Sequence, residues 1–347
     1  MRIGVIGHFG GKEHFNDGQT IKTVALYEAL LRSQAESVSI DKVDTYFIKK
    51  NPILFLCELL VAFIRDRKFV VLLSKKGRTV LFPLLFVMAT VFKKEIYHYG
   101  IGGRLAREVQ AKPLWKRYVT SFKGNWLESR SLAEQLNNLG IQNAIYLPNF
   151  KRLTILDSDD LRANDDKPFR FCMFSRVMFE KGVEDAIDAV KRINELHGVG
   201  TAILDIYGQI DPGYQQRFDE CIKAAQEFCK YGGVIPAEKS VEVLKDYFML
   251  IFPTHWRHEG IPGTIIDALS AGVPVIARRW QYCDEMLEDK ITGYIYPFDK
   301  PEQLFETVLY AVKHVDETTK MKVACLEKSK EYHEEVVVSQ IWQQIDG

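Results

Sequence analysis

The stretch of sequence that decides the fold is PTHWRHEGIPGTIIDALSAGVPVIA, residues 253–277. An apolar strand over residues 248–252 leads into its polar loop, and the pair Gly263-Thr264 then begins a helix. Gly272 is typical of the residue that follows a helix end, and the apolar, β-branched run after it predicts a buried strand. Strand, loop, helix and strand in this order indicate one βαβ unit of a parallel sheet.

The same alternation continues in both directions and predicts an α/β protein with two Rossmann-like parallel-sheet domains. Ligands of such sheets bind at the carboxyl ends of the strands, so the active site is expected in a cleft that the two domains face. Strands are expected at residues 3–6, 69–73, 95–99, 144–147, 170–175, 202–207, 248–252, 273–277 and 293–296. Helices are expected at residues 20–31, 79–92, 183–197, 214–230, 239–247, 264–271, 301–314 and 318–332.

The domain boundaries follow from an acidic stretch that ends at Pro168 and is typical of a linker. Residues 1–152 are expected to form an N-terminal Rossmann-like domain, and residues 153–168 the linker. Residues 169–329 would form a C-terminal Rossmann-like domain. Residues 330–347 would form a last helix that could pack back on the N-terminal domain.

Composition excludes several classes of protein. The 347 residues include 46 basic and 46 acidic side chains and 47% hydrophobic residues, unlike a disordered chain or a strongly basic nucleic-acid binder. The zero net charge hides unlike halves: residues 1–150 hold 22 basic and 12 acidic side chains, and residues 151–347 hold 24 and 34. The six cysteines form no CxxC pair, so neither a zinc site nor a disulfide framework is expected, and a reducing, cytoplasmic compartment fits.

Two apolar stretches, residues 53–64 and 80–92, fall short of the ~20 residues that cross a bilayer. Each is interpreted as a helix packed on a sheet. Clusters of Lys and Arg flank both, among them Lys49-Lys50, Lys75-Lys76 and Lys93-Lys94. These cations suit either solvated helix ends or contact with an anionic membrane surface.

Two loops carry residues suited to phosphate. Gly10 and Gly11 follow the first strand, and Asn16-Asp17-Gly18-Gln19-Thr20 begins a helix whose backbone N–H groups favour an anion. This is not the dinucleotide pattern G-x-G-x-x-G, and no acidic residue ends a clear second strand, so NAD binding is weakly supported. Arg176 and Lys181 flank the loop after the first strand of the second domain, where they suit a diphosphate clamp or surface salt bridges.

Two carboxylates bracket the helix start in the deciding stretch. Glu259 lies before the helix and Asp267 two turns into it, so one can face the helix mouth while the other reaches a neighbouring group. Carboxylates accept paired hydrogen bonds from sugar hydroxyls, including a ribose diol, and the helix N-terminus offers N–H donors to phosphate.

With these residues the chain resembles a retaining GT-B glycosyltransferase of family 4, also called glycosyl transferases group 1. The E-x7-E motif of that family corresponds to Glu259 and Asp267, and the R-x4-K-G clamp to Arg176 and Lys181-Gly182. The resemblance is greater to bacterial capsule, exopolysaccharide and O-antigen transferases. It rests there on NDGQT (16–20), SKKG (74–77), YGIGGRL (99–105), LPNF (147–150) and EGIPGT (259–264).

The resemblance implies that the N-terminal domain binds the acceptor and that the C-terminal domain binds the nucleotide sugar. It also implies a role for each site residue. Arg176 and Lys181 would bind the donor diphosphate, Glu259 the transferred sugar and Asp267 the nucleotide ribose. Because Asp267 is one methylene shorter than the usual Glu, its ribose contact could be shifted or water-mediated. The remaining substrate-binding positions are the glycine loop, the base-side loops and the segment at the helix start: Gly10, Gly11, Gly18, Gln19, Gly208, Ile235, Gly260, Ile261, Gly263 and Thr264.

One histidine of the N-terminal domain, His98, could approach the donor sugar. Tyr99 is the competing candidate, and a structural histidine is the alternative. Neither a metal nor a cofactor is expected, because the D-x-D pattern Asp157-Ser158-Asp159 lies in the linker and cationic side chains with helix dipoles can neutralise a leaving diphosphate.

The expected function is retaining, metal-independent transfer of a sugar from a nucleotide-diphosphate sugar in cell-surface polysaccharide biosynthesis. The acceptor would be a saccharide or a saccharide linked to a polyprenyl diphosphate, reached from the cytoplasm with peripheral contact to the inner face of the plasma membrane. No nucleic-acid partner is expected. A nucleotide-sugar 2-epimerase of related fold and a catalytically inactive nucleotide-sugar-binding protein are the alternatives.

Overall fold

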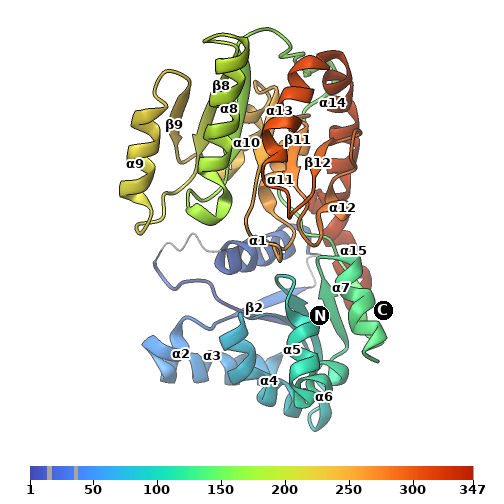
Figure 1. Cartoon of the computed structure of the whole chain (residues 1–347). Helices are drawn as coiled ribbons and strands as arrows, with labels where there is room; N and C mark the ends of the chain where they lie inside the picture. The colour runs from blue at the N-terminus through green and yellow to red at the C-terminus, as the bar shows by residue number, and fades with distance from the viewer. Residues whose placement is uncertain (14–17, 35–37, 347) are drawn as a thin grey trace. The chain divides into compact units, whose positions relative to one another are not determined.

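The computed structural model describes residues 1–13, 18–34 and 38–346. The chain forms two compact units, one of Met1–Asn149 with Glu334–Gly347 and the other of Phe150–His333 (Figure 1). Each unit is built around its own sheet and is described by itself. Among the described helices, none combines the length and the apolar character that crossing a membrane requires.

The N-terminal unit holds a six-stranded sheet in the order β2-β1-β3-β4-β5-β6, and every neighbouring pair is parallel. Central strands are buried on both faces, as apolar runs such as that of Phe69 to Leu72 require. The strands are β1 (Arg2–Gly7), β2 (Ser39–Asp44), β3 (Lys68–Leu72), β4 (Glu95–Gly100), β5 (Gly124–Leu127) and β6 (Ala144–Tyr146). The helices are α1 (Gly18–Ser33), α2 (Phe47–Lys50), α3 (Pro52–Arg65), α4 (Lys75–Thr90), α5 (Leu105–Ala111), α6 (Pro113–Ser121), α7 (Arg130–Asn138) and α15 (Glu334–Asp346).

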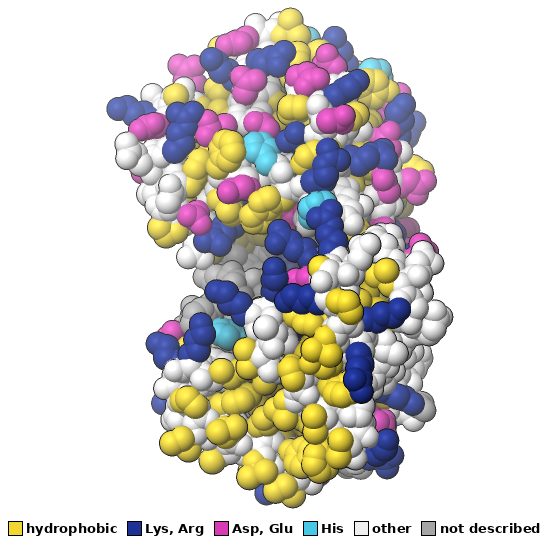
Figure 2. Space-filling model, turned by 60° about the horizontal axis from the view of Figure 1, so that its bottom comes forward, with side chains coloured by type: hydrophobic (Ala, Val, Ile, Leu, Met, Phe, Trp, Pro, Cys, Tyr) yellow, Lys and Arg dark blue, Asp and Glu magenta, His cyan; other side chains and the backbone are white. Residues whose placement is uncertain are grey.

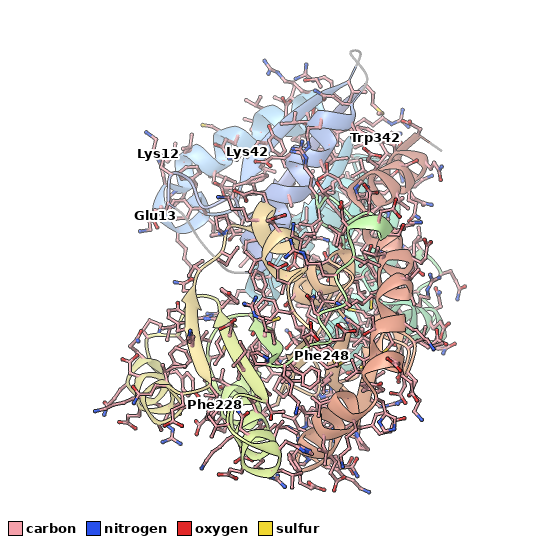
Figure 3. All side chains as sticks on the ribbon, turned by 90° about the horizontal axis from the view of Figure 1, so that it is seen from above. Lys12, Glu13, Lys42, Phe228, Phe248 and Trp342 are labelled. Atoms are coloured by element: carbon pink, nitrogen blue, oxygen red, sulfur yellow. The ribbon has the colours of Figure 1, made fainter. Side chains whose placement is uncertain are left out.

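The C-terminal unit repeats the arrangement with a parallel sheet in the order β12-β11-β10-β7-β8-β9. Phe248, labelled in Figure 3, is fully buried in its core, with its ring 5.0 Å from that of Phe169. The strands are β7 (Phe169–Phe174), β8 (Ala202–Tyr207), β9 (Cys229–Gly233), β10 (Met249–Phe252), β11 (Val275–Arg278) and β12 (Gly293–Tyr296). The helices are α8 (Val183–His197), α9 (Gln215–Ala224), α10 (Ser240–Leu244), α11 (Gly263–Ser270), α12 (Cys283–Met286), α13 (Gln303–Lys313) and α14 (Val315–Ser329), with short 3₁₀ turns.

The two parallel sheets predicted from the sequence are present, but three of the twelve strands in the described part of the chain were missed. β2 and β9 are edge strands whose side chains are mostly exposed or half-buried, and β5 is only four residues long, so none shows a long apolar run. The expectation of one helix over residues 214–230 was wrong. The helix α9 ends at Ala224, and the chain then enters β9 through a turn.

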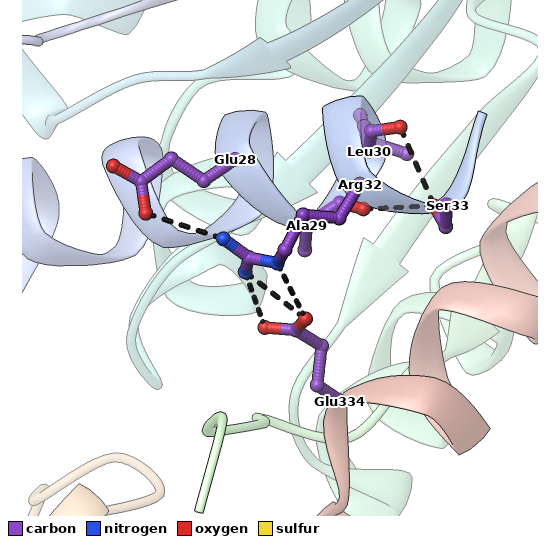
Figure 4. A network of polar contacts seen from close by, with 6 residues as sticks. All are labelled: Glu28, Ala29, Leu30, Arg32, Ser33 and Glu334. Atoms are coloured by element: carbon purple, nitrogen blue, oxygen red, sulfur yellow. Dashed lines mark hydrogen bonds and ion pairs between the residues drawn. The ribbon is translucent and has the colours of Figure 1, made fainter. Parts of the chain in front are cut away.

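The last helix, α15, belongs to the N-terminal unit, where it packs against α1. Figure 4 shows the ion pair between them, in which the Arg32 guanidinium contacts the Glu334 carboxylate at 2.7 Å. Trp342 also donates a hydrogen bond from Nε1 to Oγ of Ser33 at 2.8 Å. The C-terminal segment therefore completes the first unit after the chain has built the second.

Candidate functional site

Three loops of the C-terminal unit leave the carboxyl edge of its sheet side by side, because β10, β7 and β8 are neighbours. Gly182 joins two of them: it has φ of +73°, and a Cβ there would lie 2.2 Å from the Pro253 carbonyl oxygen. The His255 amide also donates to the Glu180 carbonyl at 2.8 Å. The loop after β7 is thus held against the loop after β10, and only glycine permits the approach.

This contact brings Lys181 to Glu259. The ammonium lies 2.6 Å from Glu259 Oε2, and the two side chains are only 11% and 14% exposed. Thr254 donates to the same oxygen at 3.2 Å, while the ring centroid of Trp256 is 4.8 Å from the ammonium. Two residues predicted for the diphosphate and the sugar are therefore direct partners.

Arg176, the other half of the predicted clamp, has a separate partner. Its guanidinium lies 2.6 Å from Asp211 Oδ2, and its side chain is 55% exposed. The backbone is nevertheless fixed, because the Val177 amide donates to the Gln209 carbonyl and the Asp211 amide donates to the Val177 carbonyl, both at 2.9 Å. Arg176 is thus an exposed cation on an ordered loop.

Helix α11 begins without a side-chain cap. Its N-cap is Pro262, so the first turn of N–H groups, including that of Gly263, receives no side-chain hydrogen bond there. Within the described part of the chain, the buried Thr264 Oγ1 also has no hydrogen-bond partner. Uncapped N–H groups at a helix N-terminus form an anion site, and a buried orphan hydroxyl beside them is a further donor.

Asp267, on the second turn of α11, is 1% exposed and strongly engaged. Lys151 Nζ lies 2.7 Å and 2.5 Å from its two carboxylate oxygens, and Ser240 Oγ donates to Oδ1 at 2.9 Å. The Lys151 side chain also covers the helix start, with Cε 2.9 Å from where a Cβ on Gly263 would lie. Sequence reasoning missed Lys151, although it directly follows the LPNF landmark at 147–150.

The loops predicted to lie near a nucleotide base meet at the ends of β8 and β9. The Gly208 amide donates to the Gly233 carbonyl and the Tyr231 hydroxyl donates to the Gly208 carbonyl, both at 2.9 Å. Ile235 follows this pair and is half-buried. Tyr231, which is 37% exposed, is a further aromatic surface that sequence reasoning did not single out.

The segment between Glu259 and the start of α11 is anchored from the side. Trp280 Nε1 donates to the Gly260 carbonyl at 3.0 Å, and Ile261 is 6% exposed. These positions hold the backbone between the two carboxylates in place.

In the N-terminal unit, backbone amides of the glycine turn donate hydrogen bonds to a carboxylate of the chain. Gly10 and Gly11 have φ of +86° and +62°, and the amides of Phe9 and Gly11 donate to the Asp44 carboxylate at 2.9 Å. Asp44 ends β2, the strand that sequence reasoning missed, so an acidic residue does end the second strand. Gly18 lies in open space, and the Gln19 side chain donates to the Leu72 carbonyl at 3.4 Å. Asn16 and Asp17 lie outside the described residues.

A second polar cluster lies at the carboxyl ends of the strands in the N-terminal unit. The Lys22 ammonium is 3.3 Å from Glu128 Oε1, donates to Asn149 Oδ1 and lies 4.8 Å from the centroid of the Tyr99 ring. Burial lowers the pKa of Lys22 to about 8, although the Glu128 charge acts in the opposite direction. Neither Lys22 nor Glu128 was singled out from sequence, because lone charged residues carry no motif.

His98 is fully buried in the core of the N-terminal unit. Its ring packs 5.1 Å from that of Phe82, and its Nδ1 is 3.2 Å from Asn125 Oδ1. Burial first, and then the Arg78 charge, lowers the pKa of His98 to about 3, so the ring is neutral at ordinary pH. This is the geometry of the structural histidine that the sequence left open. The competing Tyr99 is buried as well and donates to the Pro148 carbonyl at 3.3 Å.

In residues 1–13, 18–34 and 38–346, no three His, Cys, Asp or Glu residues lie close enough together to hold a metal ion. Asp157 precedes an exposed 3₁₀ turn, Ser158–Asp160, which contains the rest of the D-x-D pattern.

Parts of the chain are similar to known glycosyltransferases. Residues 157–326, which carry the loops of Arg176, Lys181, Glu259 and α11, match the family model of glycosyl transferases group 1. The match lies within the C-terminal unit and covers just under half of the chain. A curated relative, the amylovoran biosynthesis glycosyltransferase AmsK of Erwinia amylovora, is 22% identical over 238 residues. That alignment covers 58% of this chain and 57% of the relative, so the chain spans little more than half of AmsK.

Solved structures confirm the GT-B fold. Anabaena Alr3699/HepE in complex with UDP matches with a TM-score of 0.74 and 12% identity, and the match covers 100% of both chains. Sucrose-phosphate synthase (tll1590) from Thermosynechococcus elongatus matches with a TM-score of 0.72 and 15% identity over 99% of this chain and 98% of that one. At this level of identity the likeness establishes the fold alone.

Proposed function

We propose that this chain is a retaining glycosyltransferase that uses a nucleotide-diphosphate sugar as donor. One observation carries the proposal: the uncapped start of α11, with its orphan Thr264 hydroxyl, lies between two carboxylate–lysine pairs along the chain. Glu259 pairs with Lys181 before the helix, and Asp267 pairs with Lys151 within it. Carboxylates suit sugar hydroxyls and the cations with the helix end suit a diphosphate, so the donor chemistry is present on one segment.

The proposed reaction breaks the bond between the anomeric carbon and the diphosphate oxygen. Lys181, Arg176 and the α11 N–H groups stabilise the negative charge that develops on the leaving diphosphate, without a metal ion or a cofactor. The acceptor hydroxyl forms the new bond on the same face of the sugar, and its proton passes to a phosphate oxygen. Glu259 binds the transferred sugar through its hydroxyls, and Asp267 serves the ribose. His98, which is fully buried in this structure, stays a predicted contact of the donor sugar.

The biological setting of the proposal comes from the relatives. AmsK acts in amylovoran biosynthesis by name, and Alr3699/HepE has been solved with UDP-glucose. We infer for this chain a role in bacterial cell-surface polysaccharide synthesis, such as capsule or exopolysaccharide. Its acceptor would be a saccharide or a polyprenyl-diphosphate-linked saccharide, bound by the N-terminal unit at the inner face of the plasma membrane.

A panel of nucleotide sugars, with product analysis by mass spectrometry, tests this function. Lys181→Ala and Glu259→Ala are expected to lower donor turnover by about a hundred-fold or more, since each removes a contact to charge or hydroxyls in the transition state. Lys330→Ala and Glu327→Ala are matched controls, because that pair, 2.7 Å apart, is exposed on the same unit. Near-wild-type turnover in both site variants would overturn the assignment, and an epimerised donor without acceptor would favour an epimerase.

A further inference from the structure

Helix α3 presents apolar side chains on two opposite faces. Phe55, Leu59 and Ala62 are buried on the side that contacts β1 and β2. On the outer side the exposed large residues are Ile53, Leu56, Leu60, Val61 and Ile64, of which Ile53 and Ile64 are 75% and 71% exposed. A surface helix of a soluble protein normally carries polar side chains on its outer face, so this face lacks its expected character.

Helix α4 shows the same departure. Leu81, Phe82, Leu85 and Met88 face the core, yet no charged residue occurs from Thr79 to Phe92. The exposed positions of this segment after Thr79 are all apolar: Val80, Pro83, Leu84, Val87, Val91 and Phe92. Val80 and Val91 are 59% and 65% exposed.

The outer faces of the two helices are joined at one end. The Phe63 and Phe92 rings meet edge to face with centroids 4.9 Å apart, and Lys94 Nζ donates to the carbonyls of Phe63 and Asp66 at 2.6 and 2.7 Å. Figure 2 shows hydrophobic side chains gathered over this part of the N-terminal unit, whereas the other unit shows mixed charges. We call this surface the α3–α4 face: Ile53, Leu56, Leu60, Ile64, Val80, Leu84, Val87, Val91 and Phe92.

Cations flank the two helices of the α3–α4 face along the sequence. Residues 49–94 contain ten Lys and Arg but only two acidic residues, a net charge of +8. Of the two acidic side chains, Glu58 accepts a hydrogen bond from the Asp44 amide and Asp66 is fully buried. Outside this range, Glu13 pairs with Lys50 and Glu95 with Arg67. The exposed cations lie before, between and after the two helices: Lys49, Lys50, Arg65, Arg67, Lys75, Lys76 and Lys93.

We propose that the α3–α4 face binds the surface of an anionic lipid bilayer, with α3 and α4 lying in the plane of the interface. An apolar helix face enters the acyl boundary, while Lys and Arg at the helix ends contact anionic headgroups. The inner side of α3 is packed on its own sheet, which fixes the helix along the protein surface. A second copy of this face would oppose one net charge of +8 with another, so self-association through it is electrostatically unfavourable.

Vesicle sedimentation tests the proposal with the full chain. We expect binding to vesicles of phosphatidylcholine with phosphatidylglycerol, and much weaker binding to phosphatidylcholine alone. The triple variant Ile53→Ser, Leu60→Ser, Ile64→Ser should bind the anionic vesicles roughly ten-fold more weakly or worse. The matched control replaces three exposed apolar residues of the other unit, Leu196, Val199 and Val234, by serine, and should bind as wild type does.

The flanking cations give an independent readout. Lys75→Gln and Lys76→Gln should each weaken binding to anionic vesicles by about five-fold at low salt, and added salt should abolish the difference. If the serine and the glutamine variants both bind anionic vesicles as strongly as the wild-type protein does, the proposal is overturned. A dimer in sedimentation velocity that the serine variant dissolves would assign the face to self-association instead.

A tryptophan introduced into the α3–α4 face tests the proposal by fluorescence, without relying on a variant that loses binding. Ile64→Trp, at a 71% exposed position, should be quenched by brominated lipids in anionic vesicles, because its indole would enter the acyl boundary. Val199→Trp, at an 84% exposed position of the other unit, should not be quenched. Equal quenching of the two variants, or none of Ile64→Trp on vesicles that bind the protein, would contradict the proposed face.

Discussion

The Lys151 ammonium lies 2.5 Å from Oδ2 of the buried Asp267, at the start of helix α11. A cation beside a helix N-terminus is opposed by the helix dipole, so an attractive partner is needed to hold it there. Asp267 supplies that attraction, and Lys151 in turn packs over Gly263. The pair keeps a positive charge next to N–H groups that themselves favour an anion.

We therefore predict that Lys151→Met weakens the binding of nucleoside diphosphate by about ten-fold, because one charge-assisted contact is lost. The change should be much smaller for the matching nucleoside, which has no phosphate. Isothermal titration calorimetry measures both affinities. Lys330→Met, an exposed lysine of the same unit, is the control. Unchanged diphosphate affinity would restrict Lys151 to a structural role.

Replacing Thr264 should change the stability of the protein and its affinity for the donor in different ways. Its buried hydroxyl has no partner within the described structure, so Thr264→Val should leave the melting temperature equal or slightly raised. In the proposed complex the Thr264 hydroxyl forms a hydrogen bond with the donor that valine cannot form. Donor affinity should therefore fall by about five- to ten-fold in Thr264→Val. Thermal unfolding with and without nucleotide sugar separates the two effects. Loss of stability without loss of affinity would contradict this assignment.

Gly182 and Gly198 both have positive φ, at +73° and +98°. A Cβ on Gly182 would lie 2.2 Å from the Pro253 carbonyl oxygen, whereas a Cβ on Gly198 would meet no atom within 4 Å. Gly198→Ala should cost roughly 1–3 kcal/mol of stability from backbone strain and leave turnover intact. Gly182→Ala should displace Lys181 from Glu259 and lower turnover more than ten-fold, because small misplacements in a site are costly. Steady-state kinetics of the two variants measures the contrast.

His98 predicts a pH dependence of stability. The pKa of His98 is about 3 in the folded state and about 6.5 when unfolded, so the unfolded chain binds the extra proton between these values. Stability from this group therefore rises as pH increases from about 3 to 6.5. Between about pH 4.5 and 6.5, His98→Gln should reduce this rise in the free energy of unfolding by about 2 kcal/mol.

Urea denaturation at the two pH values measures the effect of His98. His197→Gln, on an exposed histidine at the end of α8, should retain the wild-type pH dependence. An unchanged slope in His98→Gln would mean that the ring at position 98 is hydrated in the folded protein.

Local patterns predicted most helices and all the inner strands except the four-residue β5, because apolar runs and helix-end residues act over a few positions. The helix at 183–197 was predicted with its observed bounds. β2 and β9 were missed since an edge strand needs no long apolar run. Because β2 was missed, Asp44 was not recognised as the acidic residue that ends the second strand. The Asp44 carboxylate accepts hydrogen bonds from the Phe9 and Gly11 amides, which are distant from it in sequence. A local sequence pattern does not predict such a contact.

The sequence by itself determined the two-sheet architecture and the order of Arg176, Lys181, Glu259 and α11 along it, because strand, loop and helix signals are local. Only the tertiary structure decided which charges meet. Lys151 reaches Asp267 across 116 positions, and Lys181 reaches Glu259 across 78. It also decided that His98 is buried, since burial depends on helices packed over the strand. Such pairings follow from sheet order and packing, which place distant residues together without leaving any periodicity in the sequence.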